Sequence, residues 1–223
     1  MIIAIDGPAG AGKSTVTRKL AERLDFMFLD TGAMYRAVTL VALENAIPLD
    51  DNEQLAEIAK TIELRFDGDT VFIDGQDKTK EIRTREVTRK IKSVADAIEV
   101  REHLVALQRR IAATGDFVSE GRDQGTVAFP NADCKIFLTA STRFRAIRRA
   151  LQLKEAGKDV TVEEVISDMN IRDYNDENRP VGRLMKAEDA IEVNTDNKTI
   201  DVVVDELEQI VKKRIANAST APA

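Results

Sequence analysis

A glycine-rich loop near the start of the chain limits the possible fold more than any other feature of the sequence. The segment Gly7-Pro8-Ala9-Gly10-Ala11-Gly12-Lys13-Ser14 matches the pattern G-x-x-x-x-G-K-[ST], in which glycines let the backbone curl until its N–H groups converge on one point. The apolar run 2–5 before it predicts a buried parallel strand, and apolar residues at helical spacing after it predict a helix from Lys13 to about Leu24. This order predicts an α/β fold that binds phosphate at a helix N-terminus.

The same segment indicates which phosphates are bound. A lysine at position 13 supplies a mobile cation for β- and γ-phosphates, and the hydroxyl of Ser14 is placed to reach Mg²⁺. We therefore expect a nucleoside triphosphate, ATP, to bind here. GTPases, motor ATPases, transporters and small-molecule kinases all use such a loop, so it does not identify the reaction. The expected ATP-binding residues, called the glycine loop below, are Gly7, Pro8, Ala9, Gly10, Ala11, Gly12, Lys13, Ser14 and Thr15.

Apolar runs alternate with helical patterns along the chain, which predicts a parallel sheet with helices on both faces. One segment breaks the alternation, because 62–75 has the pattern of two strands around a glycine turn. We expect an inserted subdomain over 61–95, a core formed by 1–60 and 96–215, and a disordered polar tail at 216–223. The apolar runs that predict core strands are 2–5, 26–30, 117–118, 134–140 and 190–193.

Composition excludes several classes of partner and compartment. The net charge of -6 argues against general binding to nucleic acid or anionic membranes. The single cysteine, Cys134, cannot form an internal disulfide and opens an apolar run, so we expect a core cysteine in a reducing, cytoplasmic setting. We also expect neither a signal peptide nor a membrane span, because no basic leader and no 18-residue apolar run is present.

Arginines on separate segments suggest a second phosphorylated substrate. The guanidinium group holds phosphate oxygens bidentately and stays charged. A GTPase should carry an N-K-x-D motif, whereas Asn194-Thr195-Asp196 lacks the lysine, and S-E-G-R-D is not the acidic strand end of a motor ATPase. Most exposed arginines are merely solvated, and Arg145, Arg148 and Arg149 could form one charged helix face. The arginines at loop-like positions or a helix end are Arg36, Arg122, Arg148, Arg149, Arg172 and Arg179.

Six further motifs follow the glycine loop in order: L-D-T-G-A-M-Y-R, E-I-R-T-R-E-V, V-R-E-H-L, G-R-D-Q-G-T-V-A-F-P, K-I-F-L-T-A and I-R-D-Y-N-D-E-N-R. Together they make the chain resemble bacterial cytidylate kinases, a family of P-loop nucleoside monophosphate kinases, from residue 2 to about 213. The G-R-D-x-G-T-V-x-F-P stretch is the most specific part. The resemblance implies γ-phosphoryl transfer from ATP to CMP or dCMP with Mg²⁺. It also implies a five-stranded parallel sheet flanked by helices, a monophosphate-binding insert at 61–95 and a short lid at 148–160.

The resemblance also implies roles for individual residues. Lys13, Arg122, Arg179, Arg148 and Arg149 would be the catalytic set, with Arg148 and Arg149 as lid arginines that close on ATP, and Ser14 would contact the metal. The CMP phosphate would contact Arg36, Arg122 and Arg179. The ribose would contact Arg172 and Asp176, and the base would contact Arg101 and Asp123. Thr31 and Tyr35 would line the monophosphate site.

The base assignment agrees with the chemistry of cytosine. Its N4 amino group donates to a carboxylate, and its N3 and O2 accept from an arginine, whereas uracil reverses the N4 and N3 pattern. Asp123 and Arg101 would therefore favour CMP over UMP. Three positions depart from the family pattern: Lys92 occupies a position that is often serine, Ile98 stands where the family has a turn proline, and Gln124 replaces an apolar residue. The only histidine, His103, lies in a helical pattern and is interpreted as a partly exposed structural residue.

Two other functions remain open from the sequence. One is a P-loop kinase for another acceptor, such as UMP or AMP. The other is a nucleotide-dependent switch that closes on ATP without turnover. Nothing in the sequence requires a dimer interface, and the family is often monomeric, so we expect a monomer.

Overall fold

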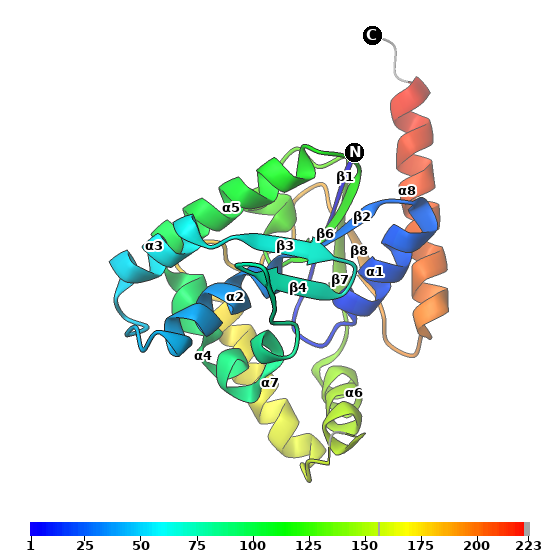
Figure 1. The fold of residues 1–223 in the computed structure, drawn as a ribbon. Coiled ribbons are helices and arrows are strands. Elements are labelled where there is room, and N and C mark those ends of the chain that lie inside the picture. Colours follow the sequence, from blue (N-terminus) through cyan, green and yellow to red (C-terminus); the bar gives the residue numbers. More distant parts are fainter. Residues whose placement is uncertain (156, 221–223) are drawn as a thin grey trace. The chain divides into compact units, whose positions relative to one another are not determined.

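The computed structural model describes residues 1–155 and 157–220. Figure 1 shows the helices and strands of the chain, which divides into two compact units. The first comprises Met1–Leu29 and Gly115–Ala223, and the second comprises Asp30–Thr114. We describe each unit by itself.

The first unit contains a five-stranded sheet in the order β2-β6-β1-β7-β8. Its central strands are parallel and in register, with Ile5 opposite both Glu120 on β6 and Ile136 on β7. The expected five-stranded parallel sheet is thus confirmed, although β6 extends three residues beyond the apolar pair 117–118. The strands are β1 (Ile2–Asp6), β2 (Met27–Asp30), β6 (Phe117–Gly121), β7 (Cys134–Thr139) and β8 (Ile191–Asn194).

Helices α1 (Lys13–Leu24) and α8 (Ile200–Thr220) pack against each other and the sheet through a shared apolar core. Leu20 and Leu207 are fully buried there, and burying such a side chain contributes about 1.5–3 kcal/mol. Cys134 is buried in the same core, and burial raises the pKa of its thiol to about 11, which confirms a core cysteine. Because α8 extends to Thr220, the expected disordered tail is helical at 216–220, and residues 221–223 lie outside the described part.

Helices α6 (Thr142–Glu155) and α7 (Val162–Glu177) form a pair that buries Ala146, Val165 and Met169. Thr161 caps α7 through a reciprocal capping box with Glu164, which fixes where this helix begins. Of the expected lid, 148–160, residues 148–155 form the second half of α6 and residues 157–160 precede α7, while residue 156 lies outside the described part. Arg148 and Arg149 lie in the middle of α6, so placing them at a helix end was wrong.

The second unit packs a three-stranded antiparallel sheet against helix α2. The expected hairpin is confirmed, with Gly68 in a left-handed conformation at its turn, and β5 adds a third strand too short to predict. Val71 and Ile73 bury one face of the hairpin against α2. The compact unit therefore covers a longer stretch of the chain than the expected insert of 61–95. The elements are α2 (Thr31–Glu44), α3 (Asn52–Thr61), β3 (Leu64–Asp67), β4 (Thr70–Ile73), β5 (Gln76–Asp77), the 3₁₀ helix η1 (Glu81–Arg83), α4 (Arg85–Asp96) and α5 (Ile98–Ala112).

Among the described residues, no helix combines the length and the apolar character that a membrane crossing requires.

Candidate active site

The topology of the first unit brings the candidate segments to one edge of the sheet. Asp6, the last residue of β1, lies opposite Gly121 on β6 and Phe137 on β7, and Thr139 on β7 lies opposite Asn194 on β8. Since these strands are parallel, the segments that follow them all leave the sheet at its carboxyl edge, where ligands bind in open α/β sheets. The glycine loop, the start of α6 and residues Gly121-Arg122-Asp123, called the G-R-D segment below, therefore meet there.

Two glycines give the glycine loop its shape. Gly7 has φ 148°, and a Cβ there would lie 2.1 Å from the carbonyl oxygen of Leu138, so only glycine allows this approach to β7. Gly12 caps α1 in the left-handed region, with φ 92° and no side-chain capping bond. The first turn of α1 also contains no acidic residue. Its N–H groups and partial positive charge are thus suited to an anion.

Lys13 is folded back over the loop that it follows. Its side chain is only 6% exposed, and Nζ donates to the carbonyl oxygens of Gly7 at 2.7 Å and Pro8 at 2.9 Å. Burial, together with the positive charge of Arg122, lowers the pKa of Lys13 to about 7. A polyphosphate placed beside Nζ would raise that pKa again, because it favours the charged amine.

This shift predicts that ATP binding takes up a proton. At pH values between the pKa of Lys13 in the free protein and its higher pKa in the ATP complex, the complex holds more protons than the free protein. The affinity for ATP therefore falls as pH rises. From about pH 7.5 to about pH 9, above the titration of the phosphate itself, we expect the Kd for ATP to rise about three- to tenfold per pH unit. Calorimetry in buffers of different ionisation enthalpy measures the uptake directly. It should persist in Lys19→Met and vanish in Lys13→Met; the absence of uptake in the unmodified protein would contradict the assignment.

The G-R-D segment is anchored by Asp6, a residue that sequence reasoning missed. The Asp6 carboxylate accepts from the backbone N–H groups of Gln124 and Gly125, each at 2.8 Å, and burial raises its pKa to about 6. The side chain of Gln124 accepts from the hydroxyl of Ser119 at 2.8 Å and is 2% exposed. The departure at Gln124 is therefore explained by a buried polar contact with β6. The available signal was a carboxylate ending an apolar strand directly before the glycine loop.

Asp176 on α7 joins two of the expected phosphate-binding arginines. Arg122 Nε donates to Oδ2 at 2.7 Å, and Arg179 Nη2 donates to Oδ1 at 2.9 Å. Burial opposes ionisation of Asp176, but the charges of Arg122 and Arg179 lower its pKa below the usual value. Asp123, which follows Arg122 in the sequence, is buried. Arg172 is exposed and lies on α7, the same helix as Asp176. The structure thus brings Arg122, Asp176 and Arg179 into direct contact.

The two expected lid arginines have different surroundings. Arg148 donates to the hydroxyl of Thr195 at 3.1 Å and to its carbonyl oxygen at 2.6 Å. The Thr195 hydroxyl in turn donates to the carbonyl oxygen of Ala11, so Arg148 is linked to the glycine loop. Arg149 is exposed and donates to Gln152 on its own helix at 3.4 Å. The structure therefore places Arg148, but not Arg149, beside the loop.

The second unit carries the remaining candidates around the N-terminus of α2. Thr31 and Tyr35 are buried, and Arg36 Nη2 donates at 2.9 Å to Asp30, which also caps α2 by accepting from the N–H of Ala33. The guanidinium of Arg101 lies 5.4 Å from the centre of the Tyr35 ring. Arg36, Tyr35 and Arg101 are thus held in place by neighbours within this unit. Lys92 forms an exposed pair with Asp96 at 2.8 Å, four residues along α4.

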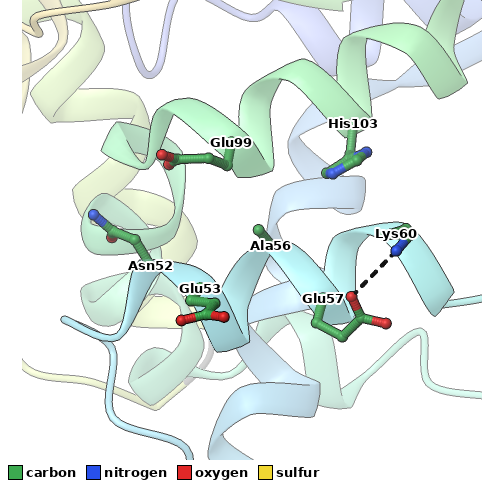
Figure 2. Close-up of a pocket in the computed structure, with 7 residues that line it drawn as sticks. All are labelled: Asn52, Glu53, Ala56, Glu57, Lys60, Glu99 and His103. Carbon is green, nitrogen blue, oxygen red and sulfur yellow. Dashed lines mark ion pairs between the residues drawn. The ribbon is translucent and has the colours of Figure 1, made fainter.

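A hollow of about 540 Å³ on the second unit lies between α3 and α5 (Figure 2). His103 is half-buried at its edge and has no hydrogen-bonded or ion-paired partner within the described ranges, which agrees with the interpretation of a partly exposed histidine. None of the candidate site residues lines this hollow. The lining residues are Asn52, Glu53, Ala56, Glu57, Lys60, Glu99 and His103.

The protein groups suited to a divalent metal are few. In the part of the chain that the structure describes, no three His, Cys, Asp or Glu side chains gather into a metal site. The hydroxyl of Ser14, exposed in the first turn of α1, is a hard oxygen donor of the kind that Mg²⁺ accepts. This donor set fits a metal ion that arrives with substrate phosphates and keeps most of its ligands from them and from water.

A parallel sheet with a phosphate loop after β1, a buried lysine at the start of α1 and arginines at the same edge define a P-loop kinase. Solved structures share this fold. A gluconokinase from Sinorhizobium meliloti matches with a TM-score of 0.53 and 15% identity over 97% of this chain and 94% of that one. A shikimate kinase from Bacteroides thetaiotaomicron matches with a TM-score of 0.50 and 11% identity over 95% and 98%.

The chain belongs to the cytidylate kinase family, whose model matches residues 3–213. It is 52% identical over 213 residues to a cytidylate kinase of Rhodopirellula baltica, covering 96% of this chain and 93% of that protein. It is 49% identical over 214 residues to a cytidylate kinase of Desulforamulus reducens, covering 95% and 96%.

Proposed function

We propose that this protein transfers the γ-phosphoryl group of ATP to CMP or dCMP, giving ADP and CDP or dCDP. The observation that carries the proposal is the placement of the glycine loop, Lys13 and the Arg122–Asp176–Arg179 cluster at one sheet edge in a chain of this family. A reaction that transfers a phosphoryl group between two negatively charged nucleotides requires positive side chains at the site to neutralise their phosphates.

The chemistry needs no protein base. An oxygen of the CMP phosphate is already anionic and can attack the γ-phosphorus directly, with ADP as the leaving group. Catalysis then consists of positioning and of neutralising charge on the transferring group by Lys13 and the arginines. Hydrolysis by water is the competing reaction, which we expect closure of the lid and the insert over the substrates to suppress.

We assign the remaining residues as follows. Arg36, Arg122 and Arg179 bind the CMP phosphate, and Arg172 and Asp176 bind the ribose. Arg101 and Asp123 read the cytosine edge, while Thr31 and Tyr35 line the site. Arg148 and Arg149 neutralise charge on ATP. Arg148 is supported by its link to the glycine loop through Thr195, whereas Arg149 requires a change from its present contact with Gln152.

We also propose Mg²⁺ as the cofactor, held by Ser14, the phosphates and water. When bound, it neutralises the β- and γ-phosphate oxygens. The protein would act as a cytoplasmic monomer in pyrimidine nucleotide metabolism, without nucleic-acid or membrane partners.

The proposal is tested by ADP release from Mg·ATP with a panel of acceptors: CMP, dCMP, UMP, AMP, GMP and none. We expect CMP and dCMP to give at least about tenfold more release than the other acceptors, since a buried polar mismatch costs about 1–3 kcal/mol. ADP release stimulated only by UMP or AMP would show that the acceptor is that nucleotide and not CMP. If ATP binds but no monophosphate stimulates ADP release, the protein would be assigned as a nucleotide-dependent switch and not as a kinase.

A further inference from the structure

Arg145 on α6 is a buried arginine that makes hydrogen bonds and an ion pair with several different segments. Its side chain is 4% exposed. Nη1 donates to the carbonyl oxygen of Ala9 at 2.9 Å, and Nε donates to that of Ala140 at 3.0 Å. Nη2 donates to the Thr142 hydroxyl at 2.9 Å and lies 2.6 Å from Oδ2 of Asp173. One guanidinium thus connects the glycine loop, the turn before α6, and α7.

We propose that Arg145 is a positioning residue for the ATP-binding loop: it holds the loop by the Ala9 carbonyl and fixes it to the α6–α7 pair. This inference deepens the proposed function and rests on it only for the identity of the nucleotide. The planar guanidinium has five donors in a rigid fork, whereas lysine has one compact ammonium. Only arginine can serve three segments at once from this position.

The contact with Ala9 affects the phosphate-binding side of the loop. The carbonyl of Ala9 and the N–H of Gly10 belong to one planar trans peptide, so the two groups point in opposite directions. Holding the oxygen against Arg145 therefore turns the Gly10 N–H away from α6. In a loop of this type, backbone N–H groups bind the phosphates, so Arg145 controls the orientation of one of these donors.

Packing supports the same link. A Cβ at Gly10 would lie 3.0 Å from the terminal methyl of Met169 on α7 and 3.3 Å from Cβ of Arg145. The loop therefore rests directly on both helices. Asp173, the ion-pair partner of Arg145, lies between Arg172 and Asp176 in sequence. A buried arginine is costly without such a partner, which explains why Asp173 faces it.

Arg145→Lys is the main test, with Arg143→Lys on the exposed face of the same helix as the matched control. Lysine keeps the charge and can keep the Asp173 pair, but it cannot also hold Ala9. We expect the Kd of a non-hydrolysable ATP analogue, measured by calorimetry without acceptor, to rise about tenfold, a difference of about 1.4 kcal/mol. The KM for CMP should change less than about twofold, and the control should match the unmodified protein.

Asp173→Asn provides a second measurement if Arg145→Lys folds poorly. It weakens the ion pair but leaves the guanidinium on Ala9, so we expect less than about a threefold change in analogue Kd. An unchanged Kd in Arg145→Lys, an equal rise in the KM for CMP, or an effect of Asp173→Asn as large as the tenfold rise expected for Arg145→Lys would each overturn the proposal. Because analogue binding needs no acceptor, these outcomes are distinct from failure of the CMP kinase assignment.

Discussion

Replacing Lys13 by methionine should lower kcat for CMP phosphorylation by about 10³-fold or more while the protein stays folded. Removing a preorganised charge from the transferring group costs several kcal/mol of transition-state stabilisation. Lys13 donates to the carbonyl oxygens of Gly7 and Pro8, and its stem lies in a buried position that methionine can fill. Steady-state kinetics with CMP and Mg·ATP measures the effect.

Stability should not fall together with activity in Lys13→Met. Burial lowers the pKa of Lys13 to about 7, below its ordinary value of 10.5. Between these values the unfolded chain binds the extra proton, so the buried amine reduces stability near neutral pH, and this cost is relieved as pH rises toward the unfolded pKa. Lys13→Met should therefore not lower the unfolding temperature at pH 7. Lys19→Met, which replaces a half-buried lysine on α1 and removes its surface pair with Asp201, is the control for both measurements. Near-normal turnover in Lys13→Met would end the assignment of the glycine loop to catalysis.

Changing Asp123 to asparagine should reduce the preference for CMP over UMP by about 10- to 100-fold. The carboxylate can only accept, which suits the N4 amino group of cytosine, whereas the asparagine amide can also donate to O4 of uracil. A mismatch of this kind is worth about 1–3 kcal/mol. The ratio of the two kcat/KM values isolates the effect from any general loss of activity.

Asp168→Asn, an exposed change on α7, is the matched control for Asp123→Asn and should leave the ratio unchanged. An unchanged ratio in Asp123→Asn would remove this residue from base recognition. A loss of activity with both substrates in equal proportion would instead assign Asp123 a role in holding the G-R-D segment.

Much of the fold could be predicted because it follows local patterns. The strand before the glycine loop, the helix from Lys13 to Leu24 and the hairpin each have a periodicity or turn signal of their own. The range of residues in the second unit could not be predicted in this way. It depends on the apolar face of the hairpin being buried by α2, which is a long-range contact. The position of Arg148 within α6 was also missed, although Ser141 before that helix and Gly157 after it are typical cap residues.

The site shows the same division. The glycine loop and the arginines could be named from motifs, but the groups that hold them could not. Asp6 and Arg145 act through main-chain atoms of segments more than 100 residues away in sequence, and a main-chain partner leaves no mark in its own side chain. Gln124 had no explanation until its contact with Ser119 was visible.

The most direct measurement is to follow the γ-phosphorus of labelled ATP during turnover with CMP and Mg²⁺. We predict that the label appears in CDP in step with ADP formation, with only a trace in inorganic phosphate, and that Lys13→Met slows this transfer at least about 10³-fold. Label released as inorganic phosphate at the rate of ADP formation, with unlabelled CMP recovered, would contradict direct transfer between two bound nucleotides.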